Sequence, residues 1–344
     1  MKSVLVDIQE LKKVFSLSQG LFFQKNVAVQ AVNGVTLKIY GGETLGLVGE
    51  SGCGKSTLGR LIMRLEVPTE GKILFQGEDI LKYTGRHLKE YRKRVQIIFQ
   101  DPYASLNPRR TAENTIAEPL RIFKTKNRSE IDAQTALLME QVGLSREQRH
   151  RYPHEFSGGQ RQRIGIARAI ALNPTLIIAD EPVSALDVSV QAQILNLMKD
   201  LQKRFGLTYL FISHDLGVVR HMSDRIAVMY LGKIVELAEN QTLYERPMHP
   251  YTMALLSAVP VLEPERKKNR IILDGDLPSP FNLPAGCAFH PRCPFKLEIC
   301  GHTEPELKER GNGHYVSCHM EGCRIRCIDH EGELFGHEGR SEIR

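Results

Sequence analysis

Two stretches near the N-terminus alternate apolar and polar residues, as half-buried strands do. They cover residues 4–15 and 27–39, and the hydrophobic segment Leu21-Phe22-Phe23 lies between them. Because successive side chains of a strand point to opposite faces, this alternation predicts strands with one buried face. We therefore expect an antiparallel pair at the start of the chain, joined by a hydrophobic loop.

Short apolar runs then alternate with helical patterns. The runs predict strands at residues 43–48, 72–76, 95–99, 175–179, 208–213 and 225–230, and the patterns predict helices at residues 58–65, 86–94, 161–172, 188–205 and 216–222. This order favours a mostly parallel sheet with helices on both faces. Strand-like runs are missing from residue 101 to about 162, where helical patterns such as residues 131–142 indicate a helical insertion.

The periodicity fades after residue 260. Residues 260–265 (PVLEPE) are typical of a linker, and the chain beyond residue 277 is rich in Pro, Gly, Cys and His. We expect a large α/β unit over residues 1–260 and a small irregular unit over residues 261–344. An irregular unit of this size usually needs a metal or a partner to hold it together.

Composition adds limits on partners and location. The 344 residues are 42% hydrophobic and 25% charged, with a net charge of +6. Without an arginine-rich arm or an aromatic-interleaved basic stripe, a nucleic-acid partner is not expected. The N-terminus lacks the apolar core of a signal peptide, and no apolar run reaches the length of a membrane span. These features predict a cytoplasmic protein whose membrane role, if any, comes through a partner.

A glycine-rich segment follows the strand at residues 43–48 and fits the phosphate-loop pattern G-x-x-x-x-G-K-[ST]. It consists of Gly49, Glu50, Ser51, Gly52, Cys53, Gly54, Lys55, Ser56 and Thr57. Glycines let backbone N–H groups converge on an anion, and the following helix adds its dipole. In this pattern Lys55 reaches the β and γ phosphates and the Ser56 hydroxyl binds Mg²⁺. The alternative is a glycine-rich turn that binds nothing. The strand–loop–helix context favours the other interpretation, that the segment binds a nucleoside triphosphate.

Two carboxylates end the apolar strand at residues 175–179. We expect Asp180 to hold Mg²⁺ opposite Ser56, and Glu181 to polarise or deprotonate the attacking water. A chance acidic turn is the alternative.

A second anion-binding site is predicted at the start of the helical run near residue 161. Its residues are Ser157, Gly158, Gly159 and Gln160. Free N–H groups and the helix dipole favour an anion at such a position. Taken alone, Ser157 is simply an N-cap.

Together these segments resemble the ATP-binding cassette (ABC) ATPases. Residues 157–160 are similar to the signature motif, which in this family serves a nucleotide bound to the other subunit of a head-to-tail dimer. The resemblance implies a RecA-like core of mixed and parallel strands, an antiparallel β-subdomain and a helical subdomain at about residues 101–162. A small irregular Cys-rich extension would follow at the C-terminus.

The resemblance also implies roles for further residues. Gln100 matches the Q-loop glutamine, which contacts Mg²⁺ and the water and links to the transmembrane partner. Ser184 and Asp187 belong to a segment similar to the D-loop, which crosses the dimer interface. His214 matches the switch histidine that contacts the γ-phosphate. Phe15 is the candidate for stacking on adenine, although the family more often uses Tyr there and Phe22 and Phe23 lie nearby.

Segments outside the shared motifs resemble the ATPases of peptide importers. They are residues 99–109, 245–260 and 277–280, while GESGCGKSTLGR is more similar to the F-type subunit than to the D-type. The resemblance implies an ATP-hydrolysing subunit that powers uptake of di- and oligopeptides from the cytoplasmic face of the cell membrane. Its partners would be a homologous D-type ATPase (or a second copy when isolated), two permeases and, indirectly, an external substrate-binding protein.

Three alternatives to this function remain open. The first is the same role in a nickel or other small-solute importer of the family. The second is a soluble ABC ATPase not coupled to transport. The third is a regulatory subunit that binds ATP without hydrolysing it, which the presence of Glu181 and His214 disfavours.

Six of the seven cysteines lie in the last sixth of the chain. Cys287, Cys293, Cys300 and Cys318 are separated by five, six and seventeen residues, unlike the close pairs of zinc ribbons. The spacing matches the C-terminal cysteines of peptide-importer ATPases, and this resemblance implies a [4Fe–4S] cluster on four thiolates. Zinc and reduced thiols are the alternatives. Cys323 and Cys327 have no assigned role.

Overall fold

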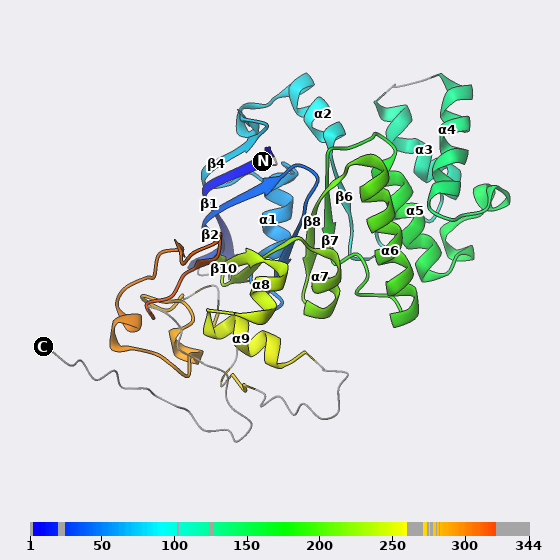
Figure 1. Ribbon diagram of the computed structural model, residues 1–344. Helices are drawn as coiled ribbons and strands as arrows, with labels where there is room; N and C mark the ends of the chain where they lie inside the picture. Colours follow the sequence, from blue (N-terminus) through cyan, green and yellow to red (C-terminus); the bar gives the residue numbers. More distant parts are fainter. Residues whose placement is uncertain are drawn as a thin grey trace, which may run out of the picture.

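A computed structural model describes residues 3–19, 25–101, 103–123, 127–259, 271–273, 275, 278–279, 281 and 283–320. The expected loop at residues 21–23, the expected linker at residues 260–265 and the last two cysteines, Cys323 and Cys327, lie outside the described residues. Figure 1 shows the phosphate-loop region in the middle of the molecule, with a group of helices on one side and the C-terminal segment on the other.

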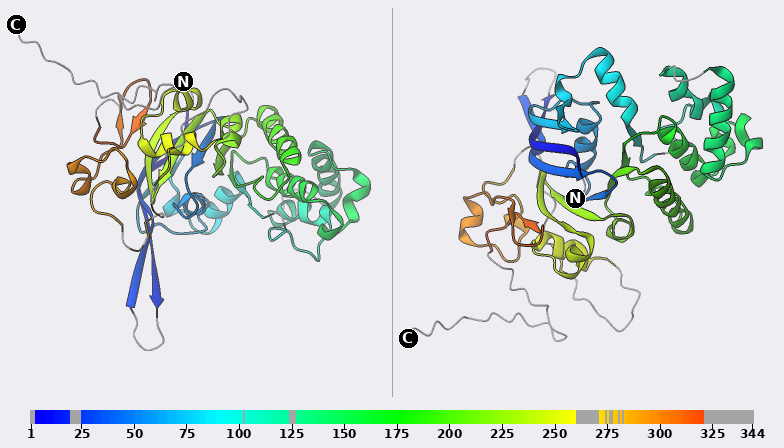
Figure 2. Two further views of the ribbon diagram at one scale, coloured as in Figure 1. Left: turned by 90° about the horizontal axis from the view of Figure 1, so that it is seen from below. Right: turned by 45° about the horizontal axis from the view of Figure 1, so that its top comes forward.

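The N-terminal strands belong to a four-stranded antiparallel sheet of order β2-β1-β4-β5. Its strands are β1 (Val4–Gln19), β2 (Lys25–Tyr40), β4 (Glu70–Phe75) and β5 (Glu78–Asp79). The expected antiparallel pair is confirmed, and both strands are longer than predicted because the pairing continues to Gln19 and Lys25. Figure 2 shows β1 and β2 extending as a two-stranded arm away from the body.

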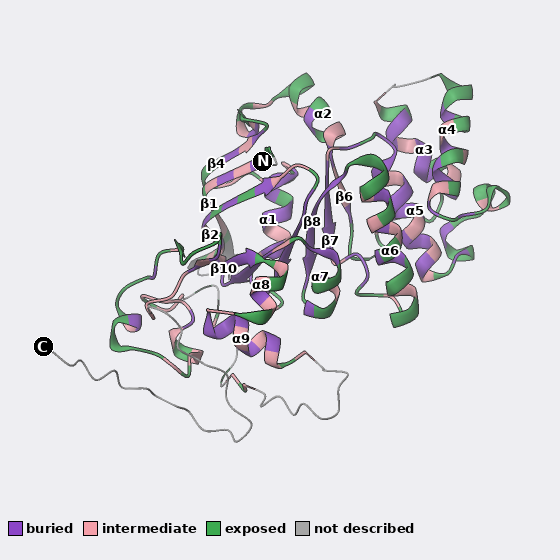
Figure 3. Ribbon diagram, in the orientation of Figure 1, coloured by how far each residue is buried: buried purple, intermediate pink, exposed green. Residues whose placement is uncertain are grey.

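The main sheet has eight strands in the order β11-β12-β10-β9-β3-β8-β7-β6. Strands β3 (Thr44–Val48), β6 (Val95–Ile98), β7 (Leu176–Asp180), β8 (Thr208–Ser213) and β9 (Arg225–Tyr230) are parallel. Three of them (β3, β7 and β8) are buried along their whole length, which explains their continuous apolar sequences (Figure 3). The predicted parallel core is therefore confirmed.

The strands that extend this sheet beyond β9 were not predicted from the sequence. Strands β10 (Lys233–Glu239), β12 (Tyr315–Val316) and β11 (Lys308–Glu309) continue it in antiparallel pairing beyond β9. β12 comes from the C-terminal segment, some eighty residues after β10. A contact over this sequence distance has no local pattern from which it could be recognised.

Helices cover the main sheet and form a separate group beside it. They are α1 (Lys55–Ile62), α2 (Gly85–Arg94), α3 (Ala112–Ile122), α4 (Arg128–Gln141), α5 (Gly158–Ile170), α6 (Val188–Phe205), α7 (Leu216–Met222), α8 (Asn240–Glu245) and α9 (Pro250–Ser257). Helices α3 and α4 pack with α5 away from the sheet (Figure 1). Among the described residues, no helix has the length and apolar character needed to span a membrane.

The described part of the C-terminal segment, residues 283–320, is largely irregular and packs against β10 and α9. Glu236 of β10 is fully buried and accepts hydrogen bonds from the backbone N–H groups of Met248 and His249. Its carboxylate also lies 2.7 Å from Nε2 of His314, which comes from the C-terminal segment. A buried carboxylate with this set of partners links the segment to β10.

Candidate nucleotide-binding site

The carboxyl ends of four parallel strands meet at one edge of the main sheet and border a cavity. This edge is where ligands bind in open α/β sheets, because the loops that follow neighbouring parallel strands come together there. The cavity has a volume of about 620 Å³. Its lining includes Val29, Ala31, Gly49, Glu50, Ser51, Gly52, Gly54, Lys55, Ser56, Thr57, Gln100, Glu181 and His214.

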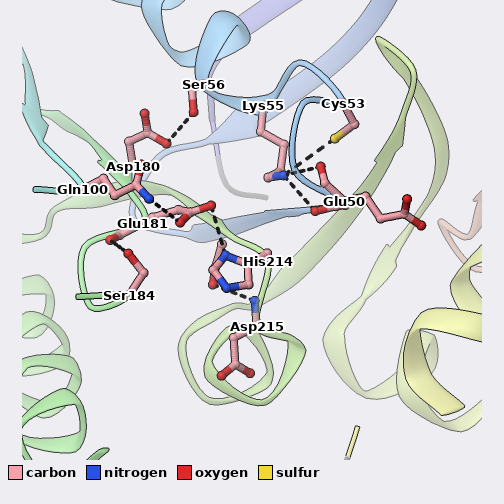
Figure 4. A network of polar contacts seen from close by, with 12 residues as sticks. Glu50, Cys53, Lys55, Ser56, Gln100, Asp180, Glu181, Ser184, His214 and Asp215 are labelled. Carbon is pink, nitrogen blue, oxygen red and sulfur yellow. Dashed lines mark hydrogen bonds and ion pairs between the residues drawn. The ribbon is translucent and has the colours of Figure 1, made fainter. Parts of the chain in front are cut away.

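The phosphate loop lies between β3 and α1 and curls around Lys55. The Lys55 ammonium is buried and donates to the carbonyl oxygens of Gly49 and Glu50 at 2.8 and 2.9 Å (Figure 4). Gly54 has a φ of +109°, and a Cβ at this position would lie 2.1 Å from the carbonyl oxygen of Ala31. Only glycine fits that turn. The loop therefore presents a cation and the free N–H groups of a helix start to the same cavity.

Ser56 and Asp180 come from two different elements and contact each other directly. The Ser56 hydroxyl, in the first turn of α1, donates to Oδ1 of Asp180 at the end of β7 over 2.9 Å. Burial raises the pKa of Asp180, the Ser56 hydrogen bond opposes this, and the neighbouring Glu181 charge adds to it. A hydroxyl and a carboxylate are oxygen ligands of the kind that Mg²⁺ prefers. The pair therefore fits the predicted Mg²⁺ site.

Glu181 is held from two sides by the other predicted catalytic residues. Gln100, which follows β6, donates from Nε2 to Oε2 of Glu181 at 2.9 Å, and His214 Nδ1 lies 3.1 Å from Oε1 (Figure 4). The backbone of Glu181 is in the left-handed region, with φ +48°, and its N–H donates to the Ile212 carbonyl of β8. This conformation carries strain, and the strand end fixes it in place. The three side chains can orient a water and accept its proton.

The predicted second anion site lies at the start of α5 and does not border this cavity. Ser157 is the N-cap of α5, and its side chain and that of Gln160 form a capping box with bonds of 3.3 and 3.1 Å. A Cβ on Gly159 would lie 2.4 Å from Val190, so glycine permits the close packing of α6. Residues 157–160 are absent from the lining of the cavity. A single chain therefore leaves its two predicted anion-binding segments apart.

The D-loop candidates lie on the surface after β7. Ser184 is exposed and donates through Oγ to the Glu181 carbonyl at 3.1 Å. Asp187 is the N-cap residue of α6, and the adjacent Val188 is 82% exposed.

Phe15 lies beside the cavity without lining it. It pairs across strands β1 and β2 with Val29, which does line the cavity. Directly opposite residues of an antiparallel pair share a face of the sheet. The Lys13 ammonium lies 4.6 Å from the centre of the Phe15 ring. Phe15 therefore keeps its place as the adenine-stacking candidate, while its alternatives Phe22 and Phe23 lie outside the described residues.

Two residues that the sequence analysis missed contact the phosphate loop. The Tyr251 hydroxyl of α9 accepts a hydrogen bond from the Glu50 N–H at 2.9 Å. Arg292 pairs with the Glu50 carboxylate, with Nη1 3.1 and 3.0 Å from its two oxygens. Neither residue belongs to a phosphate-binding pattern. Both residues lie far from the loop along the chain, so a local sequence motif does not include them.

Four cysteines lie in the C-terminal segment, but their arrangement does not by itself provide a metal centre. The Cys287 N–H donates to the Cys300 carbonyl at 2.8 Å, and Cys300 is buried. Burial raises the pKa of Cys287 and of Cys293 to about 11, and neighbouring thiols, Cys318 among them, add to the effect. These thiols are therefore protonated near neutral pH. Within the described ranges, no group of three or more His, Cys, Asp or Glu side chains is placed to hold a metal ion.

Family models and known proteins match this chain in sequence. Residues 32–184 match the family model of the ABC transporter, and residues 235–300 match that of the oligopeptide/dipeptide transporter C-terminal region. Over 322 residues the chain is 55% identical to the oligopeptide transport ATP-binding protein AppF of Bacillus subtilis, covering 93% of this chain and 98% of that protein. It is 49% identical to the dipeptide transport ATP-binding protein DppF of Escherichia coli, with coverages of 91% and 93%.

A solved structure shares the fold. The ATP-binding cassette MJ0796, in a dimeric post-hydrolysis state bound to ADP and Pi, superimposes with a TM-score of 0.61 at 29% sequence identity. The match covers 69% of this chain and 99% of that one. The similarity thus extends over a complete cassette and leaves about a third of this chain outside it.

Proposed function

Because this chain belongs to the ATP-binding subunits of oligopeptide/dipeptide ABC transporters, we propose that it hydrolyses MgATP to drive peptide uptake through membrane permeases. One observation carries the proposal. Lys55, Ser56, Gln100, Glu181 and His214 line one cavity, and Asp180 contacts Ser56 beside it. Binding, metal and hydrolytic groups are thus present together.

We assign the steps of hydrolysis to these residues. Lys55 and the loop N–H groups hold the phosphates, and Ser56 with Asp180 would hold Mg²⁺. Bound Mg²⁺ supplies positive charge that offsets the charge of the phosphates. Glu181 takes a proton from the water that attacks the γ-phosphorus, the bond to the β-phosphate oxygen breaks, and ADP and phosphate leave. Gln100 and His214 hold the Glu181 carboxylate in position for this transfer.

We further propose that the site is completed by a second ATPase subunit. The signature residues 157–160 lie away from the cavity of their own chain, and the related cassette MJ0796 was solved as a dimer. The partner would be the homologous D-type subunit, or a second copy when the chain is isolated. Two permeases and, indirectly, an external binding protein complete the importer, with this subunit at the cytoplasmic face of the membrane. Nucleic acid has no part in this function.

The permeases are proposed to contact the surface around Gln100. Phe99 and Tyr103, on either side of Gln100 in the sequence, are 41% and 64% exposed. Exposed aromatic residues are enriched where proteins bind one another. A permease segment pressed against them would move the Gln100 side chain, which bonds to Glu181. The contact would thereby couple the permease conformation to hydrolysis.

A reconstituted importer tests this function. The chain, its D-type partner, two permeases and the binding protein are placed in vesicles, and ATP hydrolysis and uptake of labelled di- and oligopeptides are measured. We expect ATP-dependent peptide accumulation that is lost with Lys55→Ala and needs the binding protein. Labelled Ni²⁺ serves as the comparison solute. Accumulation of Ni²⁺ without peptide, or hydrolysis with no uptake at all, would contradict the proposal.

The [4Fe–4S] cluster is a separate proposal, supported by cysteine spacing and family resemblance. The described residues do not form a metal-binding group, so no step of hydrolysis is assigned to it. Four thiolates would have to form, although burial raises the pKa of Cys287, Cys293 and Cys318, so only metal binding would favour them. We expect protein purified without oxygen to be coloured and to hold about four iron atoms per chain. Replacing Cys287 and Cys300 with Ser should remove both signals. A colourless, iron-free and fully folded wild-type protein would rule the cluster out.

A further inference from the structure

The loop between Cys287 and Cys293 reaches the phosphate loop of the same chain. Arg292, in the 3₁₀ turn His290–Arg292, directs Nη1 to both oxygens of Glu50 at 3.0 and 3.1 Å. Its side chain is 10% exposed, against 28% for Glu50. A charge pair with this little exposure is weakly screened by solvent, so its loss has larger effects than the loss of a surface pair.

The backbone near Arg292 is anchored by aromatic packing. Phe289 is 2% exposed, and its ring lies 5.3 Å from that of Tyr230 and 5.5 Å from that of Tyr251. The Arg292 N–H donates to the Phe289 carbonyl at 3.0 Å. The Arg292 side chain therefore extends toward Glu50 from a backbone that this packing holds in place. Little backbone entropy is left to lose when the pair forms.

Glu50 is fixed at its backbone as well. Its N–H donates to the Tyr251 hydroxyl at 2.9 Å, and its carbonyl accepts from the Lys55 ammonium at 2.9 Å. Rotation of this residue would displace an acceptor of the lysine that binds the phosphates. The contact of Arg292 with the Glu50 side chain is the third interaction that holds Glu50. Unlike Lys55, Arg292 lies outside the cassette motifs.

The charge of Glu50 gives the contact a second effect. Glu50 lines the cavity in which the triphosphate is expected. An unpaired carboxylate in that wall would repel a ligand that is itself strongly negative. Arg292 offsets this charge from the side of the C-terminal segment.

We propose that Arg292 is a positioning residue for ATP binding, which acts by neutralising Glu50 and holding its side chain. The C-terminal segment thus completes the phosphate loop of its own chain. This inference rests on the proposed binding of MgATP. It differs from a purely structural contact, in which Arg292 only fastens the segment to the cassette and the charge of Glu50 has no effect on nucleotide affinity.

A set of variants separates the two roles, each measured for KM, kcat and equilibrium ATP affinity in the full chain. Arg292→Met should raise KM for ATP about tenfold and leave kcat at saturating ATP within about twofold, because ground-state binding is lost. Arg292→Lys should recover part of the affinity. Arg292→Met combined with Glu50→Gln should bind ATP better than Arg292→Met alone, because the unpaired charge is gone.

The control is Arg310→Met, which removes a cation of the same segment. Arg310 donates to the Cys318 carbonyl and does not contact the phosphate loop, so KM should not change. Thermal unfolding monitors the fold of every variant. If Arg292→Met alone does not fold, the double variant is compared with Glu50→Gln, and the proposal requires KM values within about twofold of each other.

An unchanged KM in folded Arg292→Met would overturn the inference. So would a double variant that binds no better than Arg292→Met, because only fastening would then be lost. Failure of the wild-type protein to bind ATP would instead overturn the proposed function. The two failures are therefore distinguishable in one series.

Discussion

Replacing Glu181 with glutamine should lower ATP hydrolysis by about 10²–10⁴-fold while nucleotide binding persists. The amide cannot take the proton of the attacking water, whereas Lys55 and the Ser56–Asp180 pair are untouched. Bound ATP should then stay intact and hold two subunits together. Single-turnover phosphate release measures the chemistry, and gel filtration with and without ATP measures the dimer.

A second glutamate on the surface provides the control for this variant. Glu140 pairs with Arg146 at the end of α4, away from the cavity lining, so Glu140→Gln should hydrolyse ATP at the wild-type rate. If Glu181→Gln also kept the wild-type rate, the assignment of the proton acceptor would be wrong. The bonds of Gln100 and His214 to Glu181 would then have another purpose.

Replacing Ser157 with arginine should abolish dimerisation and turnover and spare ATP binding by the single chain. Ser157 is exposed at the start of α5 and does not line its own cavity. A large cation there would block the anion-binding N–H groups that the second subunit's nucleotide needs. Binding of a fluorescent ATP analogue should therefore be unchanged, while ATP-dependent dimers and steady-state hydrolysis disappear.

Ser145 provides a matched control, because it also caps a helical turn through a capping box, with Gln148. Ser145→Arg loses a comparable cap, worth about 1 kcal/mol, yet should keep hydrolysis. Equal losses in the two variants would point to helix stability as the cause. Hydrolysis that survives Ser157→Arg in a monomer would refute the shared site.

Local patterns predicted the elements that carry the site. The bounds of α6, β8, α7 and β9 agree with the sequence expectation, since each is set by residues within it. Helix α1 begins three residues earlier than expected, at Lys55, because the phosphate loop runs straight into its first turn. Parallel pairing then brought the strand ends together, as the alternation of strands and helices implied.

Contacts across long sequence distances could not be predicted in this way. The Arg292–Glu50 pair joins positions 242 residues apart, and the pairing of β12 with β10 depends on a two-residue strand. Neither has a periodicity, and a charged residue near cysteines is more easily taken for part of a surface loop. The catalytic and signature roles remain predictions that the variants above test, and the D-loop roles of Ser184 and Asp187 remain predictions as well.

The extra strands at the edge of the main sheet have a consequence for protein synthesis. β10 is made well before β12, so its free edge is open to pairing with other chains until residue 316 has left the ribosome. The phosphate loop likewise emerges 242 residues ahead of Arg292. At bacterial or eukaryotic elongation speeds this interval lasts roughly tens of seconds. Once β10 has been made, the cassette strands before it are complete, and for roughly ten seconds until β12 follows the sheet edge and the nucleotide loop both await the same late segment.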